Sequence, residues 1–466
     1  MNSQTLRWAV PGGLVLAIVY TLSPLTVWVA ALAAICLVAS RHGLPVSERR
    51  LLTILVVTAM AIRAAVVVLL FLRNIPYHHD AWLGVLTGDD AYGMARALRG
   101  RDLLLGVPAN RYDAFVLHDM YGENVYNDLL LAVQTLLGPA PYGMRLLNAL
   151  FFVAGALVLF RFARSAYGRL PAFAALAFVL FLPSFFVWSI SLLKEPLYFF
   201  ATAVFLAAAA HALRASAPGE RVAAGAAAFA ALYVMDAVRH HTLAIGIVGA
   251  AAGVALWLIA RRPRRYVPLA GVAVVAAVVA VAAVGPVQER VLSGLEEAAK
   301  IHAGHVFTLG HGYRTLDEYF YVRAQNAASS TLTLSADEAA RFVVRSIAAF
   351  VATPLPWEAV SIRELAYVPE QLVWYALVAL LPIGVAAGLR RDPAATAILV
   401  GYLVPTALVL ALTNGNVGTI VRLRGMVEII VVWMSALGAC VAAARLLERR
   451  AAAPTGWRPV PLEGTP

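Results

Sequence analysis

About twelve apolar stretches divide this 466-residue chain, and they limit its possible folds more than any other feature. Each is close to the ~20 residues that an α-helix needs to cross the hydrocarbon layer of a membrane. Hydrophobic residues make up 61% of the chain and mean hydropathy is +0.78, whereas a soluble domain is about half apolar. We therefore predict an all-α polytopic membrane protein, folded as a single integral membrane domain over residues 1–466. The predicted spans lie at residues 6–22, 24–40, 51–72, 144–163, 171–190, 196–213, 222–236, 242–260, 266–286, 369–389, 394–412 and 425–446. The first two are either a hairpin or one long helix kinked at Ser23-Pro24.

Arginines gather at every second turn between these stretches. Cytoplasmic loops collect Lys and Arg, so all these turns are cytoplasmic if both termini, including a tail over residues 447–466, are cytoplasmic. The same clustering accounts for the net charge of +11, and we exclude nucleic acid as a partner. The arginines concerned are Arg41, Arg49 and Arg50; Arg161, Arg164 and Arg169; Arg214 and Arg221; Arg261, Arg262, Arg264 and Arg265; Arg390 and Arg391; and Arg445, Arg449 and Arg450.

The remaining turns form the opposite, outer face. They include two long loops, 73–143 and 287–368, which we expect to contain interfacial helices, and they hold eight of the ten histidines. Loops this long, in a chain whose other connections are short, usually carry function. We expect an active site that faces outward.

The first outer loop carries an acidic pair, Asp89-Asp90, after Gly88. Polar and apolar residues then recur at helical spacing as far as Arg99, with Tyr92 on the apolar stripe, so the pair lies at a helix start. The pair has three interpretations: a helix cap, a divalent-cation site built from oxygen ligands, or a general base whose basicity is raised by its neighbour.

Two short turns on the same face add charged residues. Lys194 and Glu195 precede Pro196, which fits the first turn of a helix. Glu195 suits the helix dipole there, and Lys194 either snorkels to the interface or binds phosphate. The turn at residues 236–241 contains Arg239, His240 and His241 after a span of only about 15 residues. We predict that this helix ends early in a polar cavity, because ionisable groups at membrane depth are costly unless paired or hydrated.

The turn Asn414-Gly415-Asn416-Val417-Gly418-Thr419 leads to Arg422 and Arg424 at the start of the last span. Arginines make forked contacts to phosphate, and glycines allow close backbone approach. Glu428, four residues after Arg424, is placed to pair with it. Glu428 is also one candidate partner for Arg63, which lies midway along the third span.

Metal ligands and reactive thiols have weaker support. His302 and His305 have metal-ligand spacing, but no further ligand is fixed by the pattern, so we expect loop histidines without a metal. Cys36 and Cys440 lie within apolar stretches, and we expect buried, inert thiols.

The sequence GDDAYGMARALRG, from Gly88 to Gly100, resembles the acidic opening of the first outer loop in GT-C glycosyltransferases. These include protein O-mannosyltransferases and the aminoarabinose transferase of lipid A. Residues 145–196 are similar to the segment that follows in such enzymes, and NVGTIVRLRGMVEI resembles a closing motif of polysaccharide-cluster members. The resemblance covers residues 80–200 and, more loosely, the last 60 residues. It implies a polyprenyl-phosphate sugar donor and a catalytic base at Asp89, with Asp90 as its neighbour or substitute.

The expected function is transfer of a sugar from a polyprenyl-phosphate or diphosphate carrier to a glycan, lipid or protein hydroxyl, at the outer face of a bacterial cytoplasmic membrane. Lys194, Arg239, Arg422 and Arg424 would neutralise the leaving phosphate, and His240 and His241 would bind phosphate or sugar. No cofactor is required apart from the alternative of a divalent cation at the acidic pair. Two other functions stay open: a flippase or secondary transporter for lipid-linked glycans, and an enzyme like O-antigen ligases or polymerases.

Overall fold

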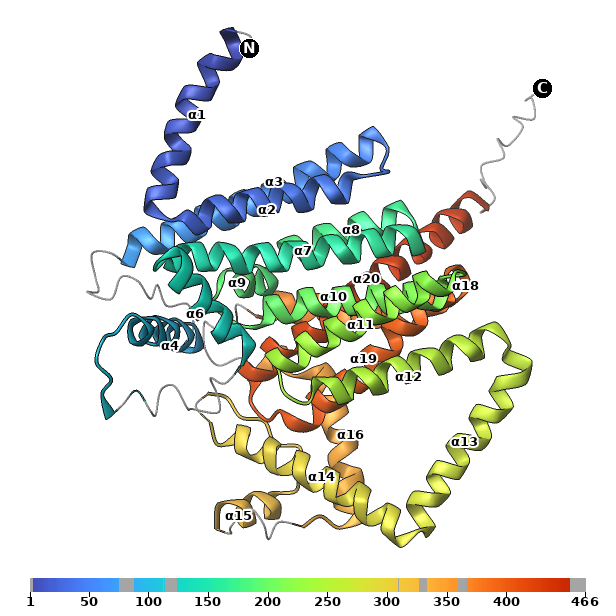
Figure 1. Ribbon diagram of the computed structural model, residues 1–466. Helices are drawn as coiled ribbons and strands as arrows, with labels where there is room; N and C mark the ends of the chain where they lie inside the picture. The colour runs from blue at the N-terminus through green and yellow to red at the C-terminus, as the bar shows by residue number, and fades with distance from the viewer. Residues whose placement is uncertain are drawn as a thin grey trace, which may run out of the picture.

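The computed structural model describes residues 3–74, 88–111, 113, 124–308, 310–326, 333–358, 365 and 367–452. These residues form helices and connecting turns, with one isolated bridge between Gly312 and Asn416 and no β-strand among them. The prediction of an all-α protein is confirmed over the described residues. Most of the long helices lie side by side in one bundle, and shorter helices gather at one of its ends (Figure 1).

Ten helices among the described residues are long and apolar enough to cross a membrane, which makes this a multi-pass membrane protein. Helices α8 (Arg169–Phe181) and α9 (Pro183–Ile190) form a bent pair, and the number of spans among the described residues rises to eleven if this pair is one span. The predicted count of about twelve is not confirmed. In α1 (Ser3–Leu22), which meets α2 at Ser23, only residues 8–17 have described side chains, and this stretch is too short to count. The ten helices are α2 (Pro24–Arg41), α3 (Val46–Asn74), α7 (Pro141–Tyr167), α10 (Glu195–Arg214), α11 (Pro218–Val238), α12 (Thr242–Arg261), α13 (Pro263–Ala283), α18 (Val368–Arg391), α19 (Pro393–Thr413) and α20 (Val417–Ala452).

Helix α7 forms the centre of the bundle and α13 its periphery. In the most apolar window of α7, 83% of the residues are buried, against 0% in α13. Helix α7 packs against α2, α3, α8 and α10, while α12 packs closely against α19. The α12–α19 contact is backbone to backbone, because a Cβ atom on Gly401 would lie 2.3 Å from the nitrogen of Gly253. Van der Waals packing between small residues drives such contacts where lipid removes the hydrophobic advantage.

The break between α8 and α9 accounts for the buried Arg63. The two helices meet at an angle of 59° at Pro183, which has no N–H to continue the ladder. Arg63 of α3 is fully buried and donates to the carbonyl of Leu180 (2.9 Å) and to the hydroxyl of Ser189 (2.7 Å). The suggestion that Glu428 pairs with Arg63 is therefore wrong: the bent helix supplies polar acceptors at that depth.

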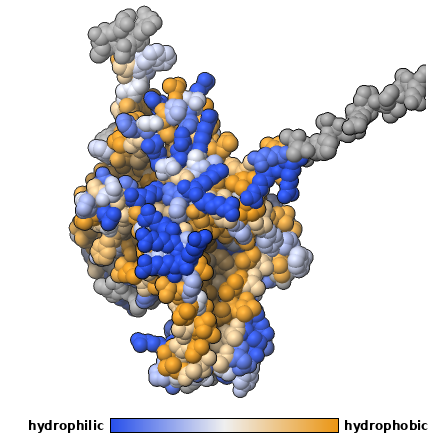
Figure 2. Space-filling model, turned by 90° about the vertical axis from the view of Figure 1, so that its right-hand side faces the viewer, coloured by the Kyte–Doolittle hydropathy of each residue, from blue (hydrophilic) through white to orange (hydrophobic). Residues whose placement is uncertain are grey.

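The arginine-bearing turns meet at one end of the bundle, as the charge pattern predicts. Arg164 forms a two-bond ion pair with Glu48 (2.9 and 3.0 Å), which joins the end of α7 to the start of α3. Arg214 pairs with Asp392, and hydrophilic side chains cover this face of the molecule (Figure 2). The side of the membrane on which this end lies stays a prediction.

Shorter helices lie at the opposite end. Helix α4 (Gly88–Leu104) confirms the helix expected after Gly88 and runs across the direction of the spans (Figure 1). Helix α6 (Val125–Leu137) packs against it. The second long loop contributes α14 (Gly285–Val306), α15 (Glu318–Asn326), α16 (Ala336–Ala352) and the 3-10 turn η2 (Pro356–Glu358). The span predicted at residues 222–236 is longer in the structure: α11 is 21 residues long and begins at Pro218, because proline is well placed in a first helical turn.

Candidate functional site

The segment between α9 and α10 is fixed by three buried polar side chains. Asp90 of α4 accepts a hydrogen bond from the backbone N–H of Leu192 (2.7 Å) and pairs with Arg145 of α7 (2.7 Å). Asn148, one turn further along α7, donates to the carbonyls of Ser191 (2.6 Å) and Leu193 (2.9 Å). The backbone of this segment is therefore held from two sides, which fixes the start of α10.

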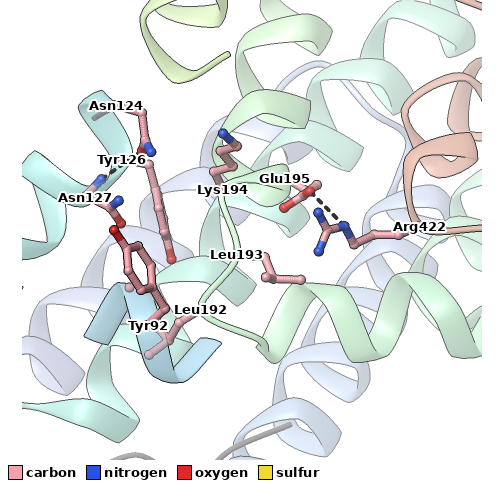
Figure 3. Close-up of a pocket in the computed structure, with 10 residues that line it drawn as sticks. Tyr92, Asn124, Tyr126, Asn127, Leu192, Leu193, Lys194, Glu195 and Arg422 are labelled. Atoms are coloured by element: carbon pink, nitrogen blue, oxygen red, sulfur yellow. Dashed lines mark hydrogen bonds and ion pairs between the residues drawn. The ribbon is translucent and has the colours of Figure 1, made fainter. Parts of the chain in front are cut away.

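Lys194 and Glu195, at the start of α10, line a polar pocket together with Tyr92 of α4 and Arg422 of α20. Figure 3 shows Tyr92 with the α6 residues on one side of this pocket, and Glu195 and Arg422 on the other. The four predicted site residues come from sequence positions more than 300 residues apart, and the bundle brings them together. The structure thus groups Tyr92, Lys194, Glu195 and Arg422 in one place.

Glu195 lies between two arginines. Its carboxylate is 3.4 Å from Nε of Arg422 and 3.6 Å from a terminal nitrogen of Arg239, and its side chain is 10% exposed. Neither carboxylate oxygen accepts a hydrogen bond, so the contacts are ion pairs of loose geometry. Both arginine side chains stay about one quarter exposed (25% and 27%). With Lys194, the described part of the rim carries three cations and one carboxylate.

An apolar pocket adjoins the polar one and shares Glu195 and Arg422 with it. Its walls include Trp188 of α9 and Phe199 of α10. Gly425 of α20 makes room for the indole ring, because a Cβ atom there would lie 1.9 Å from a ring carbon of Trp188. The site therefore has a charged half and an apolar half that meet at the two shared residues.

The sequence prediction missed the wall supplied by α6. Asn124 caps this helix by accepting from the N–H of Asn127 (3.1 Å), and both asparagines line the polar pocket. Tyr126, between them, accepts a hydrogen bond from Asn148 (2.9 Å), and burial raises the pKa of its phenol. The capping asparagine before an apolar run is a recognisable helix start, but nothing in the pattern joins it to Lys194.

The structure describes the side chain of one of the two predicted catalytic carboxylates, Asp90, and not that of the other, Asp89. Asp90 is fully buried and held by Arg145 and Leu192. Asp89 belongs to the first turn of α4, but its side chain lies outside the described residues. Position 89 is three residues before Tyr92 and four before Gly93, both of which line the pocket. Helical spacing places it on the same face of α4 as these two residues.

The turn between α11 and α12 places Arg239 beside Glu195, at the edge of the polar pocket. His240 and His241 are exposed, and His241 adopts the left-handed conformation (φ 70°) that turns the chain into α12. Asp236 accepts from the N–H of Leu243 (2.9 Å) and so ties α11 to the first turn of α12. The predicted early helix end in a polar cavity is not observed, since α11 has full spanning length.

Arg424 lies away from Arg422, although the sequence prediction grouped them. Two residues along an α-helix turn the side chain by about 200°, so the two guanidinium groups leave α20 in nearly opposite directions. Arg424 donates to Gln371 (2.8 Å) and to the carbonyl of Thr353, and its guanidinium lies over the Trp374 ring (5.0 Å). Among the described residues no direct hydrogen bond or ion pair joins Arg424 to Glu428, but the two side chains line one pocket and their charges attract each other. The predicted pairing is therefore present as proximity and not as a direct contact.

The second long loop covers the turn that precedes α20. The backbone N–H of Tyr313 donates to the carbonyl of Gly415, and that of Val417 donates to the carbonyl of His311 (both 2.8 Å). Gly415 serves contact with α14 there, because a Cβ atom would lie 2.4 Å from the carbonyl oxygen of His302. Gly415 therefore allows a close backbone approach, as predicted, but to helix α14 of the protein itself. The turn residues are a structural connection between the loop and the spans.

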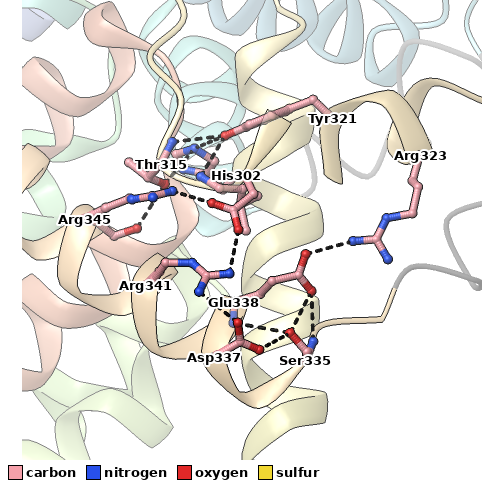
Figure 4. Close-up of polar contacts among 12 residues, drawn as sticks. His302, Thr315, Tyr321, Arg323, Ser335, Asp337, Glu338, Arg341 and Arg345 are labelled. Carbon is pink, nitrogen blue, oxygen red and sulfur yellow. Dashed lines mark hydrogen bonds and ion pairs between the residues drawn. The ribbon is translucent and has the colours of Figure 1, made fainter. Parts of the chain in front are cut away.

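The histidines of this loop have protein partners. His302 is buried and shares hydrogen bonds with Tyr321 and Thr315 (both 3.1 Å), as Figure 4 shows. Its burial lowers the pKa of the imidazole to about 4. His305 bonds to the carbonyl of Thr413 (2.8 Å). Within the described residues, no group of three or more His, Cys, Asp or Glu side chains is placed to hold a metal ion.

The fold and the pocket together define a multi-pass, all-helical membrane protein with a cationic pocket that adjoins an apolar one. No protein-family model matches the chain, and no curated protein matches its sequence.

Proposed function

We propose that this protein is a GT-C-like membrane glycosyltransferase that moves a sugar from a polyprenyl-phosphate or diphosphate carrier to a hydroxyl acceptor. The observation that carries the proposal is the junction of the two pockets at Glu195 and Arg422. A carrier lipid has the same division, with a phosphate beside an isoprenoid chain. The active site would face the periplasm of a bacterial cell, and the bilayer would supply the donor.

In this proposal each side chain at the rim has a task. Arg422, Arg239 and Lys194 neutralise the phosphate, which lowers the energy of the departing group as the glycosidic bond breaks. Arginine contributes forked hydrogen bonds and lysine a compact charge. Asn124 and Asn127, on the opposite wall, offer amide groups to sugar hydroxyls. About one quarter of each arginine side chain, of Arg239 and of Arg422, is exposed and can contact a ligand.

Asp89 is the proposed general base. It would accept the proton of the acceptor hydroxyl as that oxygen attacks the anomeric carbon, and a single displacement would invert the configuration there. General-base catalysis contributes about 10²–10⁴-fold, so Asp89→Asn should lose most turnover. Asp90 is a positioning residue in this scheme, because its carboxylate holds Leu192 and Arg145.

The test is release of free polyprenyl phosphate from polyprenyl-linked sugars, by the protein in nanodiscs with mixed glycan acceptors. Asp89→Asn is compared with Asp128→Asn, a matched change at an exposed position in the first turn of α6. The proposal requires release by the wild type and by Asp128→Asn, with a large loss in Asp89→Asn. Equal release by both variants would refute the base assignment. An arm with EDTA tests the divalent cation, and lipid binding without release would favour a flippase.

A further inference from the structure

A second polar pocket lies on the far side of α20 from Arg422. It is lined by Arg424 and Glu428 of α20 and by Tyr367, Glu370, Gln371 and Trp374 at the start of α18. Arg422 falls between Val421 and Arg424 along the helix, so the two polar pockets lie at the same level of the bundle. They are separated by the thickness of one helix, about 10–12 Å including side chains.

The second pocket holds unsatisfied polar atoms of opposite kinds. Glu428 is 4% exposed, and its Oε1 accepts no hydrogen bond. Arg424 is 3% exposed, and its Nε donates none, although its terminal nitrogens are bound to Gln371 and Thr353. An unpaired buried donor or acceptor destabilises the protein, because it loses its hydrogen bonds to water without replacement. A ligand that meets both atoms recovers this cost on binding.

The required ligand both donates and accepts hydrogen bonds. A phosphodiester only accepts, so it leaves Oε1 of Glu428 without a donor. An ammonium group only donates, and it meets the positive charge of Arg424. A hydroxyl group does both, because its O–H can donate to Glu428 while its lone pairs accept from Arg424. The chemistry of the pocket therefore favours a neutral polyhydroxyl compound.

One exposed aromatic residue suits the apolar face of a sugar ring, and a buried one supports the pocket. Trp374 is 3% exposed, donates to the carbonyl of Val351 (3.0 Å) and carries the Arg424 guanidinium over its ring (5.0 Å), so it fixes the wall of the pocket. Tyr367 is 46% exposed and stands at the start of α18. Fixed aromatic surface beside a few convergent polar groups is the usual composition of a small-molecule site.

We infer that this second pocket binds a sugar unit of the acceptor glycan, away from the hydroxyl that reacts. An extended glycan lying across the first turns of α20 would reach both pockets, whereas a lone hydroxyl on a protein or lipid would use only the first. The inference rests on the proposed function and narrows its acceptor to a saccharide.

The experiment measures direct binding, so that it does not depend on transfer. The full-length protein in nanodiscs is titrated with neutral methyl glycosides of glucose, galactose, mannose and rhamnose, observed by saturation-transfer NMR. Methylammonium and inorganic phosphate are the charged probes. The variants are Tyr367→Ala, which alters an exposed side chain, and Glu428→Gln. Arg422→Ala is the comparison variant, because it changes the polar and apolar pockets beside Glu195 and leaves every lining residue of the second polar pocket in place.

Saturable binding of a glycoside that weakens at least tenfold in Tyr367→Ala and Glu428→Gln, and persists in Arg422→Ala, supports the inference. Three results overturn it: no glycoside binds, so that the pocket holds water only; binding is unchanged in both variants; or a charged probe binds in place of the glycosides. Failure of the proposed function is separate, since it appears as glycoside binding without carrier release by the wild type.

Discussion

Replacing Asp90 by alanine removes a carboxylate that joins three parts of the molecule. The side chain is fully buried, bonds to the N–H of Leu192 and pairs with Arg145, whose side chain is 5% exposed. The variant leaves the arginine charge buried without its anion. Breaking a buried pair in this way costs about 3–5 kcal/mol. The lost hydrogen bond to the N–H of Leu192 does not add to this in full, because losses at neighbouring contacts are not additive. We therefore expect Asp90→Ala to lower the free energy of unfolding by about 3–5 kcal/mol in total.

The double variant Asp90→Ala/Arg145→Met separates the pair from its surroundings. It removes both charges, and apolar replacement of a buried pair is often neutral. Arg145 also donates to the carbonyl of Ile190 (2.9 Å), so we expect a remaining cost of about 1 kcal/mol from that lost bond. The coupling energy between the two sites should therefore be about 2 kcal/mol or more.

Unfolding free energies in mixed micelles, titrated with SDS, measure these differences. Asp89→Asn serves as comparison, since a catalytic base at the helix start should affect turnover and leave stability within about 0.5 kcal/mol, as for surface substitutions. A loss of less than about 1 kcal/mol in Asp90→Ala would contradict the role of this carboxylate. So would a loss in the double variant equal to the sum of the losses in the two single variants.

Four further substitutions test other parts of the structure. Arg63→Lys keeps the charge but cannot make the forked contacts, so it should cost about 1–3 kcal/mol in the same SDS titration. The pKa of His302 is 6.5 in the unfolded chain and about 4 in the folded protein. Between pH 6.5 and 4 the unfolded chain therefore binds a proton at His302 and the folded protein does not. Stability should therefore fall by about 3 kcal/mol as pH drops through that window, and His302→Gln should flatten the profile of melting temperature. Gly425→Ala should displace Trp188 and raise the KM for the donor at similar expression, with overpacking of about 1–3 kcal/mol. Glu195→Gln removes the carboxylate between the two arginines and should tighten carrier-phosphate binding several-fold at low salt, an effect that high salt reduces. Weaker binding would show that this carboxylate orients the arginines.

The alternation of apolar stretches and arginine-rich turns was sufficient to predict the helical class and the two ends of the bundle. Each is a local property of sequence: span length, and charge at a turn. The same holds for α4, whose residues repeat at helical spacing after the acidic pair. Lys194, Glu195 and Arg422 were also predicted as site residues, because each is a charged group at the end of an apolar span.

Contacts between distant helices were not predictable from one sequence. The partner of Arg63 depends on the break at Pro183 in another helix, where a carbonyl is left to accept. Asn124 and Asn127 have no charge to attract notice, and only the packing of α6 against α4 brings them to the pocket. Arg424 was grouped with Arg422 because the two are neighbours in sequence, whereas helical rotation separates them.

Exposure distinguishes the arginines that hold the fold from those available to a ligand. Arg63 and Arg424 are 0% and 3% exposed, and each has at least two hydrogen bonds to protein. A cation at membrane depth needs such partners, so these two hold α3 against α8 and α20 against α18. Only Nε of Arg424 is left for the neutral hydroxyl group proposed above. Arg239 and Arg422 lie 3.6 and 3.4 Å from the Glu195 carboxylate, and their side chains stay about one quarter exposed. Their charge is the one that an anionic headgroup can still engage, and this difference is why the polar pocket beside Glu195 is the better candidate for chemistry on a phosphate.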